Sequence, residues 1–145
     1  MATVKQLLNV KGRIVHTISE TATVFDAITK MVNSNTGSLV VVRDGTPCGI
    51  ITERDYLRRI AVEGRASKTT AVREIMSSKL VYVDPETDVE ECMALMTHRR
   101  IRHLPVLDGS DLAGLVSIGD VVRHLAGERE RTIQELTTYI QRGYA

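Results

Sequence analysis

Hydrophobic positions in this chain fall into two patterns that each occur twice. Val24, Ala27, Ile28 and Met31 recur at the i, i+3, i+4, i+7 spacing of an amphipathic helix. Residues 39–42 then form an unbroken apolar run that is too short for a helix and rich in β-branched side chains. Such a run predicts a strand that is buried on both faces. The pattern therefore predicts a helix followed closely by a buried strand.

The same pattern returns further along the chain. Sliding the sequence by 65 residues brings residues 24–60 onto residues 89–125 without a gap. The identical pairs are Val24/Val89, Met31/Met96, Leu39/Leu104, Val41/Val106, Gly49/Gly114, Asp55/Asp120 and Arg58/Arg123. Each copy closes on Gly, two apolar residues, Thr or Ser, two variable residues and Asp. Chance rarely keeps a turn glycine, a hydroxyl and an acid in register, so we expect a tandem repeat of one structural unit.

Turn signals and short apolar segments complete each unit. Asp-Gly pairs at 44–45 and 108–109 predict tight turns after the buried strands. Further short strands are expected near residues 14–18 and 81–83, ahead of the helices, and at 49–51 and 114–116, after the turns. These elements predict an α/β (α+β) fold of two pseudo-symmetric β-α-β-β-α repeats packed together as one module, with a C-terminal helix.

Composition and spacing also predict the boundaries of the two units. Two units of roughly 60 residues would each be marginal alone, so the halves should pack on each other. We expect a first repeat with its lead-in at 1–65, a second repeat at 66–128 and a helical tail at 129–145, joined by a polar linker at 63–70. Residues 71–76 resemble residues 3–8, and each is predicted to be a short amphipathic turn leading into its own repeat. The tail helix is expected to begin near Asp120, either unbroken or interrupted at Gly127.

Charge and composition narrow the possible functions. Hydrophobic residues make up 43% and charged residues 26% of the 145, as in ordinary globular proteins. The formal net charge of +1 gives no reason to expect nucleic acid or an anionic membrane as a partner. No apolar run approaches a membrane span, and no secretory signal is present, so we expect a cytoplasmic protein. An organellar protein after removal of a transit peptide would look the same. Cys48 and Cys92 lack metal-ligand spacing and are interpreted as small buried hydrophobes.

Two β-α-β-β-α repeats that each close on Gly-h-h-(Thr/Ser)-x-x-Asp resemble a tandem pair of cystathionine-β-synthase-type (CBS) domains. The resemblance runs from about residue 4 to about residue 129 and leaves nothing over for an enzyme, as in stand-alone CBS-pair proteins. Residues 50–56 and 139–144 are especially similar to single-pair proteins of bacteria and plant organelles. The resemblance implies a regulatory module that binds AMP, ADP, ATP or S-adenosylmethionine and modulates an unidentified partner protein. It also implies a homodimer formed through helices, for which the Val24/Met31 and Val89/Met96 stripes offer apolar surface.

The hydroxyl-x-x-acid motif has two interpretations. Thr52 with Asp55, and Ser117 with Asp120, each match a capping box, as Thr87 with Glu90 does for the second repeat's first helix. A purely structural role would be enough to account for the hydroxyls. However, a helix N-terminus also suits a phosphate, and a carboxylate one turn later can accept two hydrogen bonds from a ribose diol. The resemblance implies this second role, with Thr52 and Asp55 in one cleft and Ser117 and Asp120 in the other.

The second repeat carries basic residues where the first carries polar ones. Residues 98–103 read His-Arg-Arg-Ile-Arg-His, and the resemblance places phosphate-binding residues here. Arg102 and His103 are therefore expected to bind phosphate, a role for which arginine is well suited, and residues 98–100 are interpreted as cations at a helix C-terminus. The first cleft lacks this pair, although Arg54 lies near it in sequence. We expect the second cleft to hold a phosphorylated nucleotide more tightly.

Catalysis has little support in the sequence. No nucleophile with a paired base, no G-x-x-x-x-G-K-(S/T) loop and no HExxH is present. We therefore expect no enzyme, no catalytic cofactor and no metal, and an adenosyl nucleotide only as a regulatory ligand. Two other functions stay open. A ligand-independent scaffold is disfavoured by the Asp in both motifs, and nucleic-acid binding through residues 99–103 is disfavoured by the near-neutral charge and the scarcity of aromatic residues.

Overall fold

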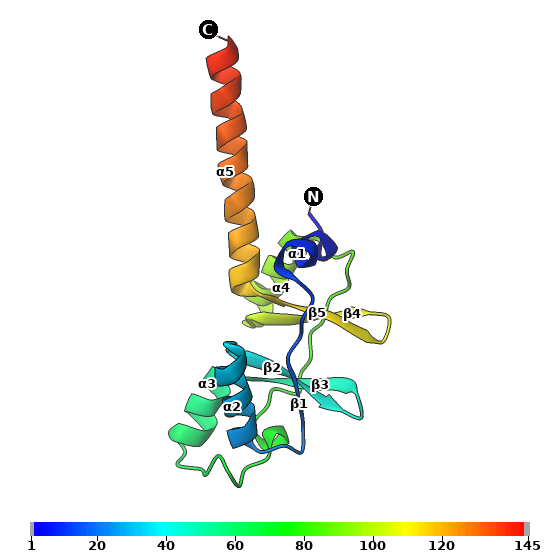
Figure 1. The fold of residues 1–145 in the computed structure, drawn as a ribbon, viewed down its shortest axis with the longest axis vertical. Coiled ribbons are helices and arrows are strands. Elements are labelled where there is room, and N and C mark those ends of the chain that lie inside the picture. The colour runs from blue at the N-terminus through cyan, green and yellow to red at the C-terminus, as the bar shows by residue number, and fades with distance from the viewer. Residues whose placement is uncertain (1, 144–145) are drawn as a thin grey trace.

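The structure, a computed structural model, describes residues 2–143. In chain order the elements are α1 (Val4–Lys11), β1 (Thr17–Ser19), α2 (Val24–Ser34), β2 (Ser38–Arg43), β3 (Thr46–Thr52), α3 (Glu53–Tyr56), the π-helical turn η1 (Leu57–Ala61), the 3-10 turn η2 (Val72–Glu74), α4 (Val89–Arg99), β4 (His103–Asp108), β5 (Asp111–Ser117) and α5 (Ile118–Gly143) (Figure 1). The expected α/β fold of two similar halves and a C-terminal helix is confirmed. Tyr144 and Ala145 of the expected tail lie outside the described residues.

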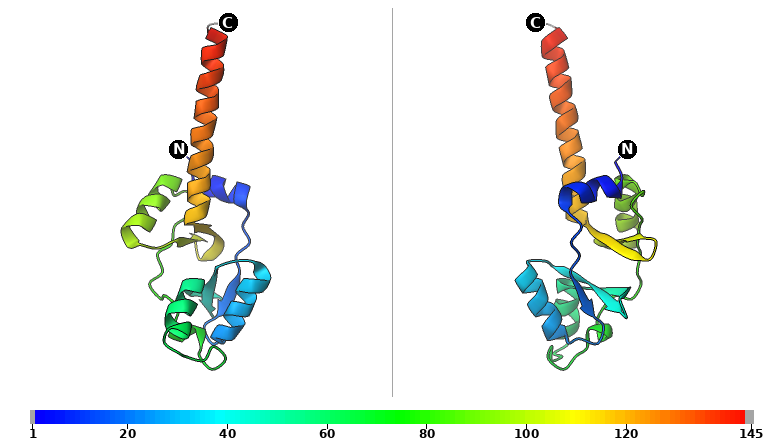
Figure 2. Two further views of the ribbon diagram at one scale, coloured as in Figure 1. Left: turned by 90° about the vertical axis from the view of Figure 1, so that its left-hand side faces the viewer. Right: turned by 45° about the vertical axis from the view of Figure 1, so that its right-hand side comes forward.

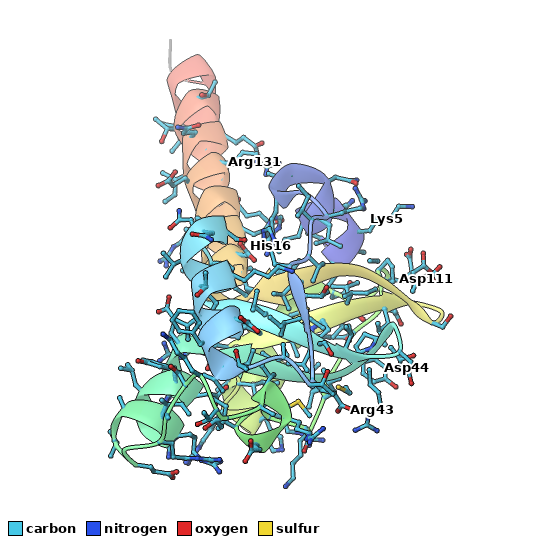
Figure 3. All side chains as sticks on the ribbon, turned by 60° about the horizontal axis from the view of Figure 1, so that its bottom comes forward. Lys5, His16, Arg43, Asp44, Asp111 and Arg131 are labelled. Atoms are coloured by element: carbon cyan, nitrogen blue, oxygen red, sulfur yellow. The ribbon has the colours of Figure 1, made fainter. Side chains whose placement is uncertain are left out.

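Each half is built on an antiparallel hairpin. Strands β2 and β3 pair in the first half, and β4 and β5 pair in the second half. The two hairpins project to the same side of the molecule, with Asp44 and Asp111 at their tips (Figures 1 and 3). Asp44 and Gly45 both adopt positive φ angles, 50° and 79°, as a two-residue hairpin turn requires. The predicted strands on either side of each turn are therefore confirmed in both halves.

The halves differ in the strand that precedes the first helix. In the first half β1 runs parallel to β2, and Val40 donates its amide to the carbonyl oxygen of His16 at 3.1 Å. The position equivalent to Val40 in the second half is Pro105, which has no amide proton to donate. The expected strand at 81–83 is consequently reduced to a single parallel bridge between Val83 and Val106.

The lead-in segments are exchanged between the halves. Helix α1 packs Val4, Leu7 and Leu8 into the core of the second half, and Val72 and Ile75 around η2 pack into the core of the first. The expectation that each segment serves the repeat that follows it is therefore wrong. Figure 2 shows the consequence, with α1 lying beside α5, in the lobe that also contains α4, and far from α2. The repeats in the sequence therefore do not coincide with the two packed halves, because each half takes its lead-in segment from outside its own repeat.

The exchange also changes how α4 begins. Its N-cap is Asp88, which makes no side-chain capping bond, and the expected capping box of Thr87 and Glu90 is not formed. The Thr87 hydroxyl instead accepts the amide of Asp84 at 3.2 Å. The first amide of α4, that of Val89, donates to the carbonyl oxygen of Ala2 at 2.9 Å. The chain's first residues thus perform the capping that the sequence assigned to Thr87.

Core packing removes the apolar stripes that were expected to form a dimer. The side chains at both ends of each stripe are at most 2% exposed and belong to the two cores: Val24, Met31, Val89 and Met96. They pack inward against their own sheets and are not available to a second copy. Other apolar side chains on the surface are described below.

Helix α5 is continuous. It begins at Ile118, directly after β5, and passes through Gly127 without a break. Its later turns extend away from both lobes (Figures 1 and 2). None of the helices within residues 2–143 combines the length and the apolar character that crossing a bilayer requires.

Candidate functional site

The first motif forms the predicted capping box at the start of α3. The Thr52 hydroxyl oxygen accepts the amide of Asp55 at 3.2 Å. In return, Asp55 Oδ2 accepts the Thr52 amide at 2.9 Å and the Thr52 hydroxyl proton at 3.1 Å. No hydrogen bond between described residues uses Asp55 Oδ1, and the side chain is only half-buried. One carboxylate oxygen is held by the cap, and the other is free to accept.

A cavity of about 410 Å³ lies beside this motif, and both halves of the chain line it. Thr52, Arg54 and Asp55 come from the first half. Arg102, just before β4, and His103, its first residue, come from the second. Residues 77–81, between η2 and α4, supply part of the remaining wall. The volume lies within the range of small-molecule sites, so a ligand in this cavity would touch both halves.

Both charged and apolar side chains line the cavity. Its permanent cations, Arg54, Lys79, Arg100 and Arg102, outnumber its carboxylates, Glu53 and Asp55. Its apolar side chains are Ile50, Leu80, Val81 and Ile101. Arginine recognises phosphate groups in a bidentate manner, and an apolar wall suits the face of a flat ring. The lining therefore fits an anion that carries an apolar or aromatic group and a hydroxyl donor for Asp55.

His103 is neutral more readily than an ordinary histidine. Burial lowers the pKa of its imidazole, and the positive charges of Lys11 and Arg102 act in the same direction against the opposing effect of Asp120. His103 pairs with Ser117 in the hairpin of β4 and β5, so it lies near the second motif as well as on the cavity wall. Its protonation state therefore depends on the charge of the second motif, through Lys11 and Asp120, and on that of the cavity, through Arg102.

The second motif forms the same capping box but has a different environment. Asp120 donates its amide to the Ser117 hydroxyl oxygen at 3.1 Å, and Asp120 Oδ2 accepts the Ser117 amide at 2.8 Å. Lys11 Nζ lies 2.5 Å from Oδ2, and Arg123 Nη2 lies 2.7 Å from Oδ1. Burial favours the neutral acid, but the bonds from Lys11 and Ser117 prevail and lower the pKa of Asp120. Both oxygens of this carboxylate are occupied.

These placements correct the expected division of the site residues. Arg102 and His103 were expected to serve the cleft of Ser117 and Asp120, but they line the cavity that contains Asp55. The reason is that the halves face each other, so the wall opposite one motif is made by the other half. The first motif, which seemed to lack a basic pair, has one.

Two basic residues of the cavity were missed in the sequence. Arg100 was interpreted as a cation at a helix end, and it does cap α4, with φ at 55°, but it also lines the cavity. No sequence motif points to Lys79. Extending the alignment of residues 3–8 with residues 71–76 by three positions would have paired Lys79 with Lys11, and this was the signal available for finding it.

The cysteines and potential metal ligands add little chemistry. Cys92 is fully buried, and burial raises the pKa of its thiol to about 11, as expected for a small core hydrophobe. Cys48 is half-buried on β3, with Sγ 3.9 Å from Glu20 Oε2. Within residues 2–143, no three His, Cys, Asp or Glu side chains gather closely enough to hold a metal ion.

Comparison with known proteins agrees with this architecture. The family model described as CBS domain matches residues 9–62 and again residues 72–127. The CBS domain-containing protein CBSX3, mitochondrial, of Arabidopsis thaliana is 52% identical over 127 residues, which cover 84% of this chain and 62% of that protein. The CBS domain-containing protein YhcV of Bacillus subtilis is 35% identical over 121 residues, covering 83% of this chain and 84% of that protein.

A solved structure shares the fold over most of its length. It is that of a putative signal-transduction protein with CBS domains from Burkholderia ambifaria MC40-6, with a TM-score of 0.82 and 47% identity, and it covers 86% of this chain and 93% of the other. The family model alone covers well over half of the present sequence. The chain therefore belongs to the CBS domain family and contains a pair of CBS domains.

Proposed function

We propose that the cavity beside Asp55 binds an adenosine-containing ligand, either AMP, ADP, ATP or S-adenosylmethionine, and that the chain is a regulatory module. The observation that carries this proposal is the meeting of a carboxylate with one free oxygen and several basic side chains in one cavity. Asp55 supplies the carboxylate, and Arg54, Lys79 and Arg102 supply positive charge. We propose no catalytic role and no catalytic cofactor for these residues.

The lining suggests how such a ligand would lie. A ribose diol carries two hydroxyl donors, and Asp55 Oδ1 can accept at least one of them while Oδ2 remains part of the cap. The adenine ring would pack against apolar side chains such as Ile50 and Ile101, and phosphate groups would lie towards Arg102. In this pose each half contributes a different part of the recognition.

Regulation would follow from this bridging position. A ligand shifts a protein between two arrangements only if it contacts them differently. Because the cavity wall comes from both halves, a change in their relative placement changes the contacts that a ligand makes. We propose that a partner protein reads this arrangement, inside the cell, in the cytoplasm or an organelle. The relative CBSX3 is named as mitochondrial.

A more distant structure helps to choose the ligands for a test. The CBS domain pair of the protein MJ0100 was solved in complex with 5'-methylthioadenosine and S-adenosylmethionine. At 22% identity and a TM-score of 0.78, its likeness to this chain concerns the fold alone. S-adenosylmethionine therefore belongs in the same titration series as the nucleotides.

Calorimetric titration of AMP, ATP and S-adenosylmethionine tests the proposal. Asp55→Asn removes the charged acceptor, and the loss of hydrogen bonds to a charged group, roughly 1.5–3 kcal/mol, corresponds to binding weakened by about tenfold to more than a hundredfold. Asp111→Asn, on the exposed tip of the second hairpin, makes the same chemical change away from the cavity and should bind as wild type. Absence of heat with all three ligands would contradict the proposal and favour a ligand-independent scaffold.

We also propose that the chain associates with itself. Apolar side chains remain exposed on the outer faces of several helices, among them Phe25 and Val32 on α2 and Ile133, Leu136 and Ile140 on α5. The α5 residues recur at spacings of three and four, which places them along one face of the helix. A homodimer would cover part of this surface.

A further inference from the structure

The two lead-in segments carry a lysine at matching positions. When residues 3–8 are aligned with residues 71–76, Lys11 falls onto Lys79. Because the lead-ins are exchanged, Lys11 lies beside the second motif and Lys79 lies beside the first. Lysines at equivalent positions of the two lead-ins therefore lie beside different motifs, Lys11 beside Asp120 and Lys79 in the cavity of Asp55.

Lys11 is fully engaged. Its ammonium group donates to Asp120 Oδ2 at 2.5 Å and also to the carbonyl oxygen of Leu115. The Asp120 side chain is only 8% exposed, and that of Lys11 is 31% exposed. Arg123 donates to the other carboxylate oxygen at 2.7 Å. Two cations from the same chain thus occupy the carboxylate that would hold a ribose.

The equivalent cations of the first half do not reach Asp55. Lys79 and Arg58 correspond to Lys11 and Arg123, and neither forms an ion pair with Asp55 among the described residues. Arg58 lies in the π-helical turn η1, whereas Arg123 lies in the regular helix α5. The backbone differs between η1 and α5 at this point, so the side chain of Arg58 does not take the direction that Arg123 takes towards its Asp. The cavity of about 410 Å³ lies beside the Asp55 carboxylate.

We propose that Lys11 is a tethered internal cation that closes the second motif, so that the chain binds a single adenosyl ligand, at Asp55. This rests on the function proposed above. A ligand at Asp120 would have to replace ion pairs, in which donor and acceptor are both charged, with hydrogen bonds from hydroxyl groups, in which only the acceptor is charged. It would also have to compete with a lysine that α1 holds in place at a high effective concentration. Withdrawal of Lys11 opens a second site, since Arg123 is 74% exposed and can move into solvent.

The number of bound ligands tests the proposal. Equilibrium dialysis and calorimetry use whichever of AMP, ATP and S-adenosylmethionine binds wild type most tightly. Wild type should bind one per chain, Lys11→Met two, and the double variant Asp55→Asn with Lys11→Met one. Lys5→Met, on the exposed face of the same helix, loses the same charge and should bind one. Lys11→Arg retains the charge and should also bind one.

The outcomes separate the two proposals. No binding to wild type would overturn the proposed function together with the proposal that Lys11 closes the second motif. Two ligands in wild type, or one ligand in both wild type and a folded Lys11→Met protein, would overturn the role of Lys11 alone. If Lys11→Met does not fold, as judged by circular dichroism, Lys11→Gln replaces it. One bound ligand per chain in that variant would equally overturn the role of Lys11.

Discussion

The backbone amide of Val89 donates to the carbonyl oxygen of Ala2 at 2.9 Å, so the start of the chain closes the amino end of α4. The amide of Val4 donates in the opposite direction, to the carbonyl oxygen of Thr87, at 2.8 Å. Together with the apolar face of α1, these bonds make the first residues a part of the second half. The first half is completed in the same way, since the amide of Val24 donates to the carbonyl oxygen of Thr70.

Truncation of Leu8 should therefore destabilise the protein as a core substitution would. Leu8 is 1% exposed and packs among residues of the second half. Leu8→Ala is expected to lower the free energy of unfolding by about 2–5 kcal/mol. Val10→Ala, on the same helix at 90% exposure, should change it by less than about 0.5 kcal/mol. Urea unfolding measures both, and equal effects of the two substitutions would contradict the role given to α1.

Gly49 should tolerate no side chain. A Cβ there would lie 2.7 Å from the carbonyl oxygen of Ser77 and 2.8 Å from Met76 Sδ. Ser77 cannot easily move, because it exchanges two backbone hydrogen bonds with Ile50, of 3.0 and 2.9 Å. We expect Gly49→Ala to lower the free energy of unfolding by about 1–3 kcal/mol.

Gly127→Ala is the matched control for Gly49→Ala. Nothing lies within 4 Å of a Cβ at Gly127, and alanine is favoured over glycine inside a helix by about 1 kcal/mol. The substitution should leave the urea midpoint unchanged or raise it, and it should raise the helical signal in circular dichroism. Similar losses of stability for the two variants would show that the contact with Ser77 is not the cause.

The pH dependence of stability should reveal His103. Burial, together with the charges of Lys11 and Arg102, lowers its pKa from the ordinary value of 6.5. Just below pH 6.5 the unfolded chain therefore binds more protons than the folded one, and stability falls as the pH falls. Between pH 7.5 and 5.5, wild type should lose more unfolding free energy than His103→Gln. Parallel urea midpoints for the two proteins across this range would contradict a lowered pKa of His103.

Self-association should depend on the exposed face of α5. Ile133 and Leu136 are 56% and 57% exposed, and burying each in an interface contributes roughly 1.5–3 kcal/mol. The double variant Ile133→Ser with Leu136→Ser is expected to shift sedimentation from dimer towards monomer. Glu135→Gln, between them in sequence, should sediment as wild type. A monomeric wild type at micromolar concentration would remove the dimer from consideration.

Local features of this fold were predictable from the sequence, and the reasons are physical. The apolar run at 39–42 can be removed from water only as a buried strand. Thr52 and Asp55 form a cap within four neighbouring residues. The strand missing from the second half could have been inferred from Pro105, because a missing amide proton is also a local property. In each case the interaction lies within a few residues or follows from one side chain.

The relations between the halves could not be predicted in the same way. Periodicity shows which face of residues 3–8 is apolar, but not which core that face enters. The shift of 65 residues shows that Arg102 matches Gly37, but equivalent positions need not lie in equivalent clefts. Both line the same cavity, one from each half. The placement of Arg102 and His103 beside Asp55 therefore became visible only in three dimensions.

The exchanged lead-ins also determine when the protein can fold during its synthesis. Helix α1 is made before both repeats, but its apolar face has no partner until residues up to Val121 have been made. The first half waits in turn for Val72 and Ile75, which lie beyond the point where its own repeat ends. The core of the first half uses only residues 18–76, so this half can close once that stretch has been made, in line with the usual order in which N-terminal units fold first. The second half cannot, because its core joins α1 to residues 83–121. A nascent chain that stops midway through the second repeat leaves α1 unpaired, so completion of the fold is tied to translation of almost the entire pair.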